Sequence, residues 1–179
     1  MEKIGFTEML YSVVIGISFL RIGLEMSAIS VLMFSFAFAV IVDDWIQYHY
    51  FIHIAQGEKE GGTKKRLLLM IIDVLFLAIW YLIIILPGNL FQYYLFLFFA
   101  LFLLGAIWTL IAVGRVGGII GFVKNTDISL AVYFFAVFAG YFLYGNAPER
   151  FIIMLASIIF WALTRISTWS EIVGSEFSL

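Results

Sequence analysis

Cysteine is absent from this sequence, so disulfides, thiolate nucleophiles and zinc–thiolate sites are excluded. Charge is also scarce: only 12% of the residues are charged, and the net charge is −2. A nucleic-acid-binding protein needs a basic surface, which this composition does not supply. There are only two histidines, too few for a histidine-rich metal centre. These absences exclude thiol-based sites and leave nucleic-acid binding without an electrostatic basis.

Hydrophobic residues, in contrast, make up 64% of the chain, and the mean hydropathy is +1.10. A water-soluble domain of this size would have to expose large apolar patches to accommodate them. We therefore expect lipid to be the solvent. A membrane-spanning helix needs about 20 apolar residues, so the chain has room for about six such helices joined by short loops.

The apolar segments predict a single all-α transmembrane domain over residues 1–179. Charged residues, glycine and proline interrupt these segments and mark the turns. The last residues, 174–179, fit either a native polar tail or a vector remnant. The expected spans cover residues 4–22, 27–55, 67–86, 90–113, 128–144 and 149–169.

The distribution of lysine and arginine predicts the orientation of these spans, because cytoplasmic loops carry an excess of both. Eight of the ten lie on one side, and only Arg21 and Arg150 lie on the other. We therefore expect both termini to be cytoplasmic, in a prokaryotic cell membrane. The eight residues on the cytoplasmic side are Lys3, Lys59, Lys64, Lys65, Arg66, Arg115, Lys124 and Arg165.

Several ionisable side chains fall inside the expected spans, where each costs about 2.5–3.5 kcal/mol to insert. All are expected in the cytoplasmic half of the bilayer, as an inner polar network in which Arg165 pairs with Asp43 or Asp73. The network either serves transport or only holds the helices together. Its expected members are Glu8, Asp43, Asp44, Trp45, His49, Asp73 and Arg165.

Other candidate sites are weaker. His49 and His53 are four residues apart and share a helix face, but two histidines do not make a metal site, so we expect none. Aromatic residues, 19% of the chain, fit interfacial belts and lipid-facing or packed positions. Phe98, in the middle of a span, is expected to face lipid. No cofactor is implied.

Residues 3–15 resemble the start of the first helix in the endolysosomal potassium channels and their prokaryotic six-helix relatives. That family's signature is Arg, three residues and Phe-Ser-Asp; here the spacer is one residue shorter, and Phe6 alone is identical. The second span carries a Ser-Phe pair followed by Trp45 and His49, similar to the family's pattern. The third has Asp73 in place of an expected Asn. The low-temperature-requirement family shares the acidic first helix and the tryptophan-rich second helix, and is a rival resemblance.

The channel resemblance implies a pore lined by the first helices of several copies of the chain. Its constriction would consist of bulky aliphatic side chains, here Val13, Ile17 and Leu20, which share one helix face. An aliphatic stripe at this spacing also occurs in any apolar span.

The expected function is therefore passive cation conduction, with potassium as the ion, through a homo-oligomeric pore rather than catalysis. The alternative is a proton- or cation-coupled transporter that uses Asp43, Asp44 and Asp73 as a carboxylate relay. A membrane enzyme that holds magnesium on the adjacent aspartates is a third possibility, but the sequence shows neither a second acidic motif nor a basic phosphate clamp.

Overall fold

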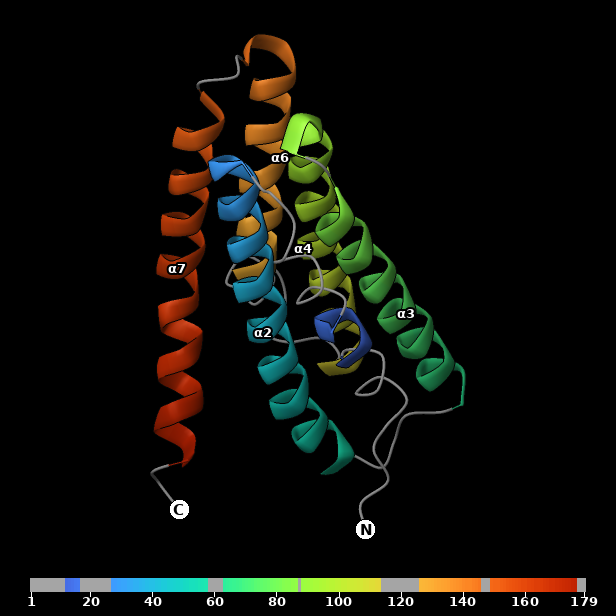
Figure 1. The fold of residues 1–179 in the computed structure, drawn as a ribbon. Coiled ribbons are helices and arrows are strands. Elements are labelled where there is room, and N and C mark those ends of the chain that lie inside the picture. Colours follow the sequence, from blue (N-terminus) through green and yellow to red (C-terminus); the bar gives the residue numbers. More distant parts are fainter. Residues whose placement is uncertain are drawn as a thin grey trace. The chain divides into compact units, whose positions relative to one another are not determined.

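A computed structural model describes residues 12–16, 27–57, 63–86, 88–113, 126–145 and 149–176. Helices account for nearly all of these residues, and no strand occurs among them (Figure 1). The chain divides into two compact units, Met1–Leu90 and Phe91–Leu179. The all-α prediction is confirmed for the described residues, whereas a single domain over residues 1–179 stays a prediction.

The first unit contains α2 (Ala28–Gly57), α3 (Thr63–Ile85) and the short 3-10 helix η1 (Gly88–Leu90). Ser27 begins α2 as its N-cap: its Oγ accepts a hydrogen bond from the Ser30 N–H at 3.3 Å, and its carbonyl accepts one from the Val31 N–H at 3.0 Å. Both α3 and η1 contact α2. A helical turn at residues 12–16 also belongs to this unit.

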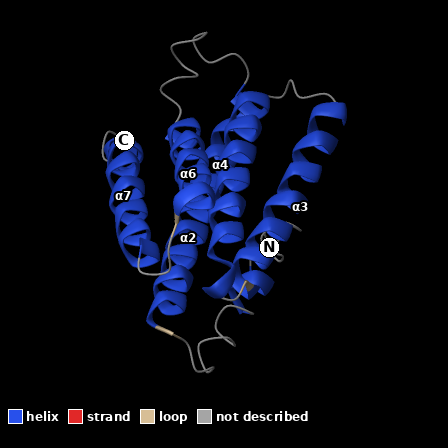
Figure 2. Ribbon diagram, turned by 90° about the horizontal axis from the view of Figure 1, so that it is seen from above, coloured by secondary structure: helices blue, strands red, loops and turns tan. Residues whose placement is uncertain are grey.

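The second unit contains α4 (Phe91–Val113), α6 (Thr126–Tyr144) and α7 (Glu149–Glu176), drawn as ribbons in Figure 2. Helices α4 and α6 are antiparallel, because positions later in α4 meet positions earlier in α6. Their contact includes five pairs of aromatic rings with centroids 5.1–5.5 Å apart. The pairs are Phe91–Tyr141, Phe96–Phe138, Phe98–Phe134, Phe99–Phe135 and Phe102–Phe134.

Helices occupy the expected ranges from residue 27 onward, with differences at their ends. Helix α3 begins four residues before the expected 67, and α7 continues seven residues beyond the expected 169. Neither added segment contains proline, which would end a helix. The expected first span lies outside the described residues except at 12–16.

Four of the described helices are long and apolar enough to cross a membrane. The qualifying segments are Ala28–Gln47, Leu67–Ile85, Phe91–Ile111 and Thr126–Tyr144. They fall in α2, α3, α4 and α6, one to a helix. By length and composition the fold is therefore that of an all-helical membrane-embedded protein.

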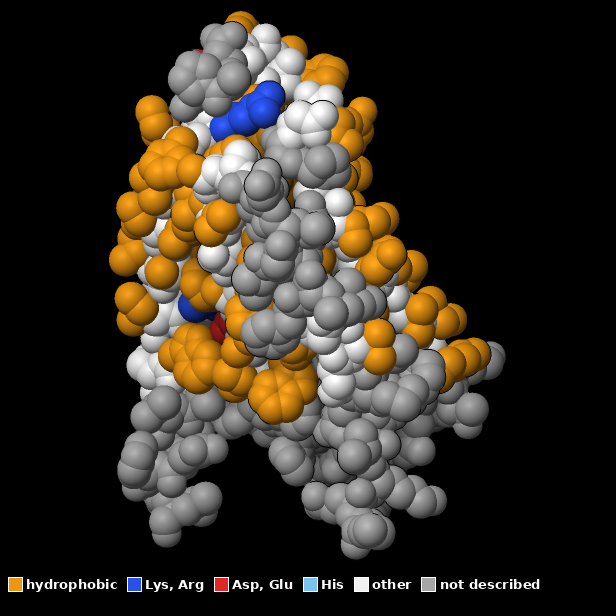
Figure 3. Space-filling view, viewed as in Figure 1, with side chains coloured by type: hydrophobic (Ala, Val, Ile, Leu, Met, Phe, Trp, Pro, Cys, Tyr) orange, Lys and Arg blue, Asp and Glu red, His pale blue; other side chains and the backbone are white. Residues whose placement is uncertain are grey.

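Burial along α7 is the reverse of that in a water-soluble helix. Between residues 151 and 166 its exposed side chains are all apolar, whereas its buried residues include Ser157 and Arg165. Hydrophobic side chains likewise cover the described surface along α7 and α3 in Figure 3. A helix in lipid is expected to turn its polar groups inward in this way, because lipid cannot hydrogen-bond them. The exposed large hydrophobic side chains of α7 are Phe151, Ile152, Leu155, Ile159, Leu163 and Ile166.

Phe98 does not face lipid as expected, because its ring is fully buried. It lies 4.8 Å from Tyr94 and 5.2 Å from Phe134, between α4 and α6. An evenly apolar helix has no polar face to show which side packs inward, so sequence alone did not reveal this burial. Phe96, two residues earlier, is 44% exposed and is the better example of a lipid-facing ring on α4.

Candidate functional site

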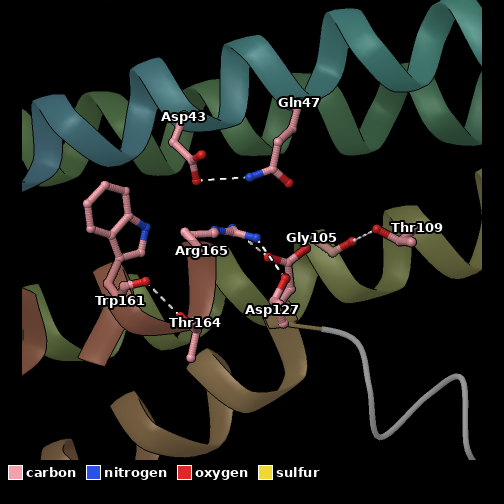
Figure 4. A network of polar contacts seen from close by, with 9 residues as sticks. Asp43, Gln47, Gly105, Thr109, Asp127, Trp161, Thr164 and Arg165 are labelled. Carbon is pink, nitrogen blue, oxygen red and sulfur yellow. Dashed lines mark hydrogen bonds and ion pairs between the residues drawn. The ribbon is translucent and has the colours of Figure 1, made fainter. Parts of the chain in front are cut away.

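The guanidinium of Arg165 is the centre of a buried polar cluster in the second unit. One terminal nitrogen forms an ion pair with Asp127 Oδ1 at 2.7 Å, and the other donates to Thr126 Oγ1 at 2.8 Å (Figure 4). The Arg165 side chain is 3% exposed and that of Asp127 is 16% exposed. A buried arginine in an apolar environment thus has both a counter-charge and a hydroxyl acceptor.

Local sequence explains why both partners lie together. Thr126 and Asp127 open α6, and a carboxylate in a first helical turn is stabilised by the helix dipole. Helix α7 runs antiparallel to α6, which brings Arg165 to the same level. The guanidinium carbon also lies 6.0 Å from the centre of the Phe102 ring, at the limit of a cation–π contact with α4. Helices α4, α6 and α7 therefore meet at the charged guanidinium of Arg165.

Asp127 was missed by the sequence analysis because it lies one residue before the expected start of its span at 128. The available signal was the Thr-Asp pair in front of an apolar run, which is typical of a helix N-terminus. Asp127 and Arg165 are 38 residues apart, so only the fold pairs them. The expected pairing of Arg165 with Asp43 or Asp73 stays a prediction.

A second polar position lies on α2 in the first unit. Asp43 is 3% exposed, and its Oδ2 accepts a hydrogen bond from Gln47 Nε2 at 2.9 Å, one helical turn further along (Figure 4). Both residues lie within the apolar segment Ala28–Gln47. Asp44 is partly buried, and successive side chains on a helix diverge by about 100°. The two carboxylates therefore leave α2 in different directions.

The remaining members of the expected polar network differ in exposure, and some lie outside the described residues. Trp45 is exposed, and Asp73 is partly buried on α3. His49 belongs to α2, but its side chain lies outside the described part of the structure, as does Glu8. The role of the expected inner polar network stays a prediction.

Of the expected pore constriction, only Val13 is described. It lies on the helical turn at 12–16 and is 51% exposed, whereas the neighbouring Val14 is buried. Ile17 and Leu20 lie outside the described residues.

Among the side chains that the structure describes, no group of three or more histidine, cysteine, aspartate or glutamate residues could hold a metal ion. No model of a known protein family matches the chain, and neither a curated protein nor a solved structure is detectably similar to it.

Proposed function

We propose that this protein is an integral membrane protein that moves small monovalent cations, potassium in particular, by passive conduction through a pore formed by several copies of the chain. The observation that supports this most directly is Asp43, a buried carboxyl group inside an apolar helix. An acidic side chain there is costly and is typical of an ion pathway. Negative charge near a pore mouth also raises the local cation concentration.

The proposed pore is lined by the first helix, with Val13, Ile17 and Leu20 at its constriction. Val13 is exposed beside the buried Val14, an arrangement that suits a side chain facing other copies across an axis as well as one facing lipid. Aliphatic side chains close such a passage by expelling water from it. The resemblance of residues 3–15 to the potassium-channel family supports the same arrangement.

In the proposed topology six helices cross the membrane of a prokaryotic cell, and both termini are cytoplasmic. Helix α7 would be the sixth, and its apolar outward face supports this assignment. With 28 residues it is about 42 Å long, more than the hydrocarbon core of about 30 Å requires. Its last turns would then extend into the cytoplasm.

Labelling of single cysteines tests this topology. A thiol reagent confined to the cytoplasmic side should label a cysteine placed at Gly61 and leave one at Gly88 unlabelled. The natural chain contributes no background, because it has no cysteine. The reverse labelling pattern would contradict the proposed orientation.

Flux through liposomes containing the purified protein tests the function. Under a potassium gradient we expect uncoupled cation flux, and Ile17→Asn should increase it by roughly tenfold if the polar side chain lowers the barrier by about 1.4 kcal/mol. The variant should also discriminate less between potassium and sodium. Phe96→Asn, at an exposed position on α4, is the matched control and should leave flux unchanged. A wild-type protein that passes no cation across a range of pH would overturn the channel proposal.

The second candidate is a proton- or cation-coupled transporter, favoured by the bond between Asp43 and Gln47. The Gln47 amide donates to a carboxyl group that is 3% exposed within an apolar segment, and buried carboxyl groups of this kind are typical of proton relays in transporters. Such a transporter would move its substrate only with a driving gradient, and Asp43→Asn should abolish the coupling. In a channel the same change should reduce flux but leave it uncoupled.

A further inference from the structure

Helices α6 and α7 are joined by polar contacts at both ends and in the middle. The hydroxyl–hydroxyl contact in the middle is 3.3 Å long, and those at the two ends are 2.7–2.8 Å. These contacts pair Thr126 and Asp127 with Arg165, Tyr133 with Ser157, and Tyr141 with Arg150.

All of these residues lie on one face of each helix. On α6, Thr126, Tyr133 and Tyr141 follow one another at intervals of seven and eight residues, about two helical turns each. Their partners on α7, taken in the same order, are Arg165, Ser157 and Arg150, at intervals of eight and seven residues. The ring of Tyr133 also stacks on Phe160 with 4.3 Å between centroids. One register is thus kept along the whole contact between the two helices.

The middle contact has a defined direction. The Ser157 hydroxyl donates to the Ile153 carbonyl at 2.8 Å, which uses its only proton. The Tyr133 hydroxyl must therefore be the donor to Ser157.

The end nearest the α6–α7 connection depends on a glycine. Arg150 Nε donates to the Tyr141 hydroxyl at 2.7 Å. A Cβ atom at Gly145 would collide with the Tyr141 ring and carbonyl, so a residue without a side chain lets this tyrosine keep its place. The glycine therefore helps to hold one end of the contact.

The contact between α4 and α6 is of a different kind. Five ring pairs join them, and such pairs are attractive over a range of offsets and tilts. The Arg165 guanidinium also reaches α4, where its carbon lies 6.0 Å from the centre of the Phe102 ring. Packed helices joined in this way can shift by small sliding movements.

We propose that α6 and α7 form one rigid unit of fixed register, held at each end by an arginine, and that movement in this half of the chain takes place along the α4–α6 contact. A slide of α6 along α7 by one turn would break all of the polar contacts together, where lipid offers no replacement. This inference goes beyond the proposed function, because it concerns which helices move together.

Cysteine crosslinking tests the register without reference to transport. Val137 and Met154 lie midway between the Tyr133–Ser157 and Tyr141–Arg150 contacts, so the register places them opposite one another. A short thiol crosslinker should join V137C to M154C in the full-length protein in lipid, and should join V137C to I158C, one turn further along α7, much less. D127N should raise the yield of the shifted pair by loosening one end. Equal yields for the two pairs in the otherwise unchanged protein would overturn the proposal.

A flux measurement tests the movement, and this part rests on the proposed function. Crosslinking V137C to M154C should leave cation flux within about twofold of the uncrosslinked variant, whereas crosslinking F99C to F135C, across α4 and α6, should stop most of it. Loss of flux on crosslinking within the α6–α7 pair would show that these helices move against each other. An absence of flux in the wild type would refute the proposed function, and the crosslinking yields would still decide the register.

Discussion

Asp127→Asn is expected to lower the free energy of unfolding by about 3–5 kcal/mol, the usual cost of removing one partner from a buried ion pair. The reason is that Arg165, with its side chain 3% exposed, would keep its charge in apolar surroundings and lose its ion pair with Asp127. Denaturant titration in mixed detergent micelles measures the effect.

The double variant Asp127→Asn with Arg165→Met provides the control. Because it removes both charges and keeps an apolar side chain of useful length, we expect it to be more stable than Asp127→Asn alone and to regain most of the loss. If Asp127→Asn unfolds at the same denaturant concentration as the wild type, the guanidinium reaches water instead, as long basic side chains near membrane surfaces can.

Phe134→Ala is expected to destabilise the second unit by about 2–3 kcal/mol. This side chain is fully buried and lies against Phe98 and Phe102 at 5.2 and 5.5 Å. The estimate is below the roughly 3–5 kcal/mol typical of such changes in water-soluble proteins, because the transfer of a ring from lipid to an apolar core contributes little. What remains is the cost of the cavity and of the lost ring contacts.

Phe142→Ala is the matched control on the same helix. Phe142 is 66% exposed, so its truncation should change the free energy of unfolding by less than about 0.5 kcal/mol. Both variants can be compared by the same titration. Equal effects at the two positions would contradict the α4–α6 packing described above.

The sequence alone was sufficient to predict the helices, because each apolar run is bounded by glycine, proline or charged residues. The ranges expected from residue 27 onward are helical, and four of the helices are suited to crossing a membrane. Local signals such as Ser27 before α2 and Thr126 at the start of α6 act within a few residues and are readable without the fold.

Which face of each helix is buried was decided only by the tertiary structure. An evenly apolar helix such as α4 gives no periodic signal, so Phe98 was expected to face lipid although it is buried against Phe134. The partner of Arg165 was likewise unpredictable: an arginine in a membrane needs an acidic partner, but several aspartates were available in the sequence. Asp127 is 38 residues away, and the antiparallel packing of α6 and α7 brings it within 2.7 Å. Composition and local sequence thus predicted apolar helices suited to a membrane, whereas pairing between distant residues required the packed fold.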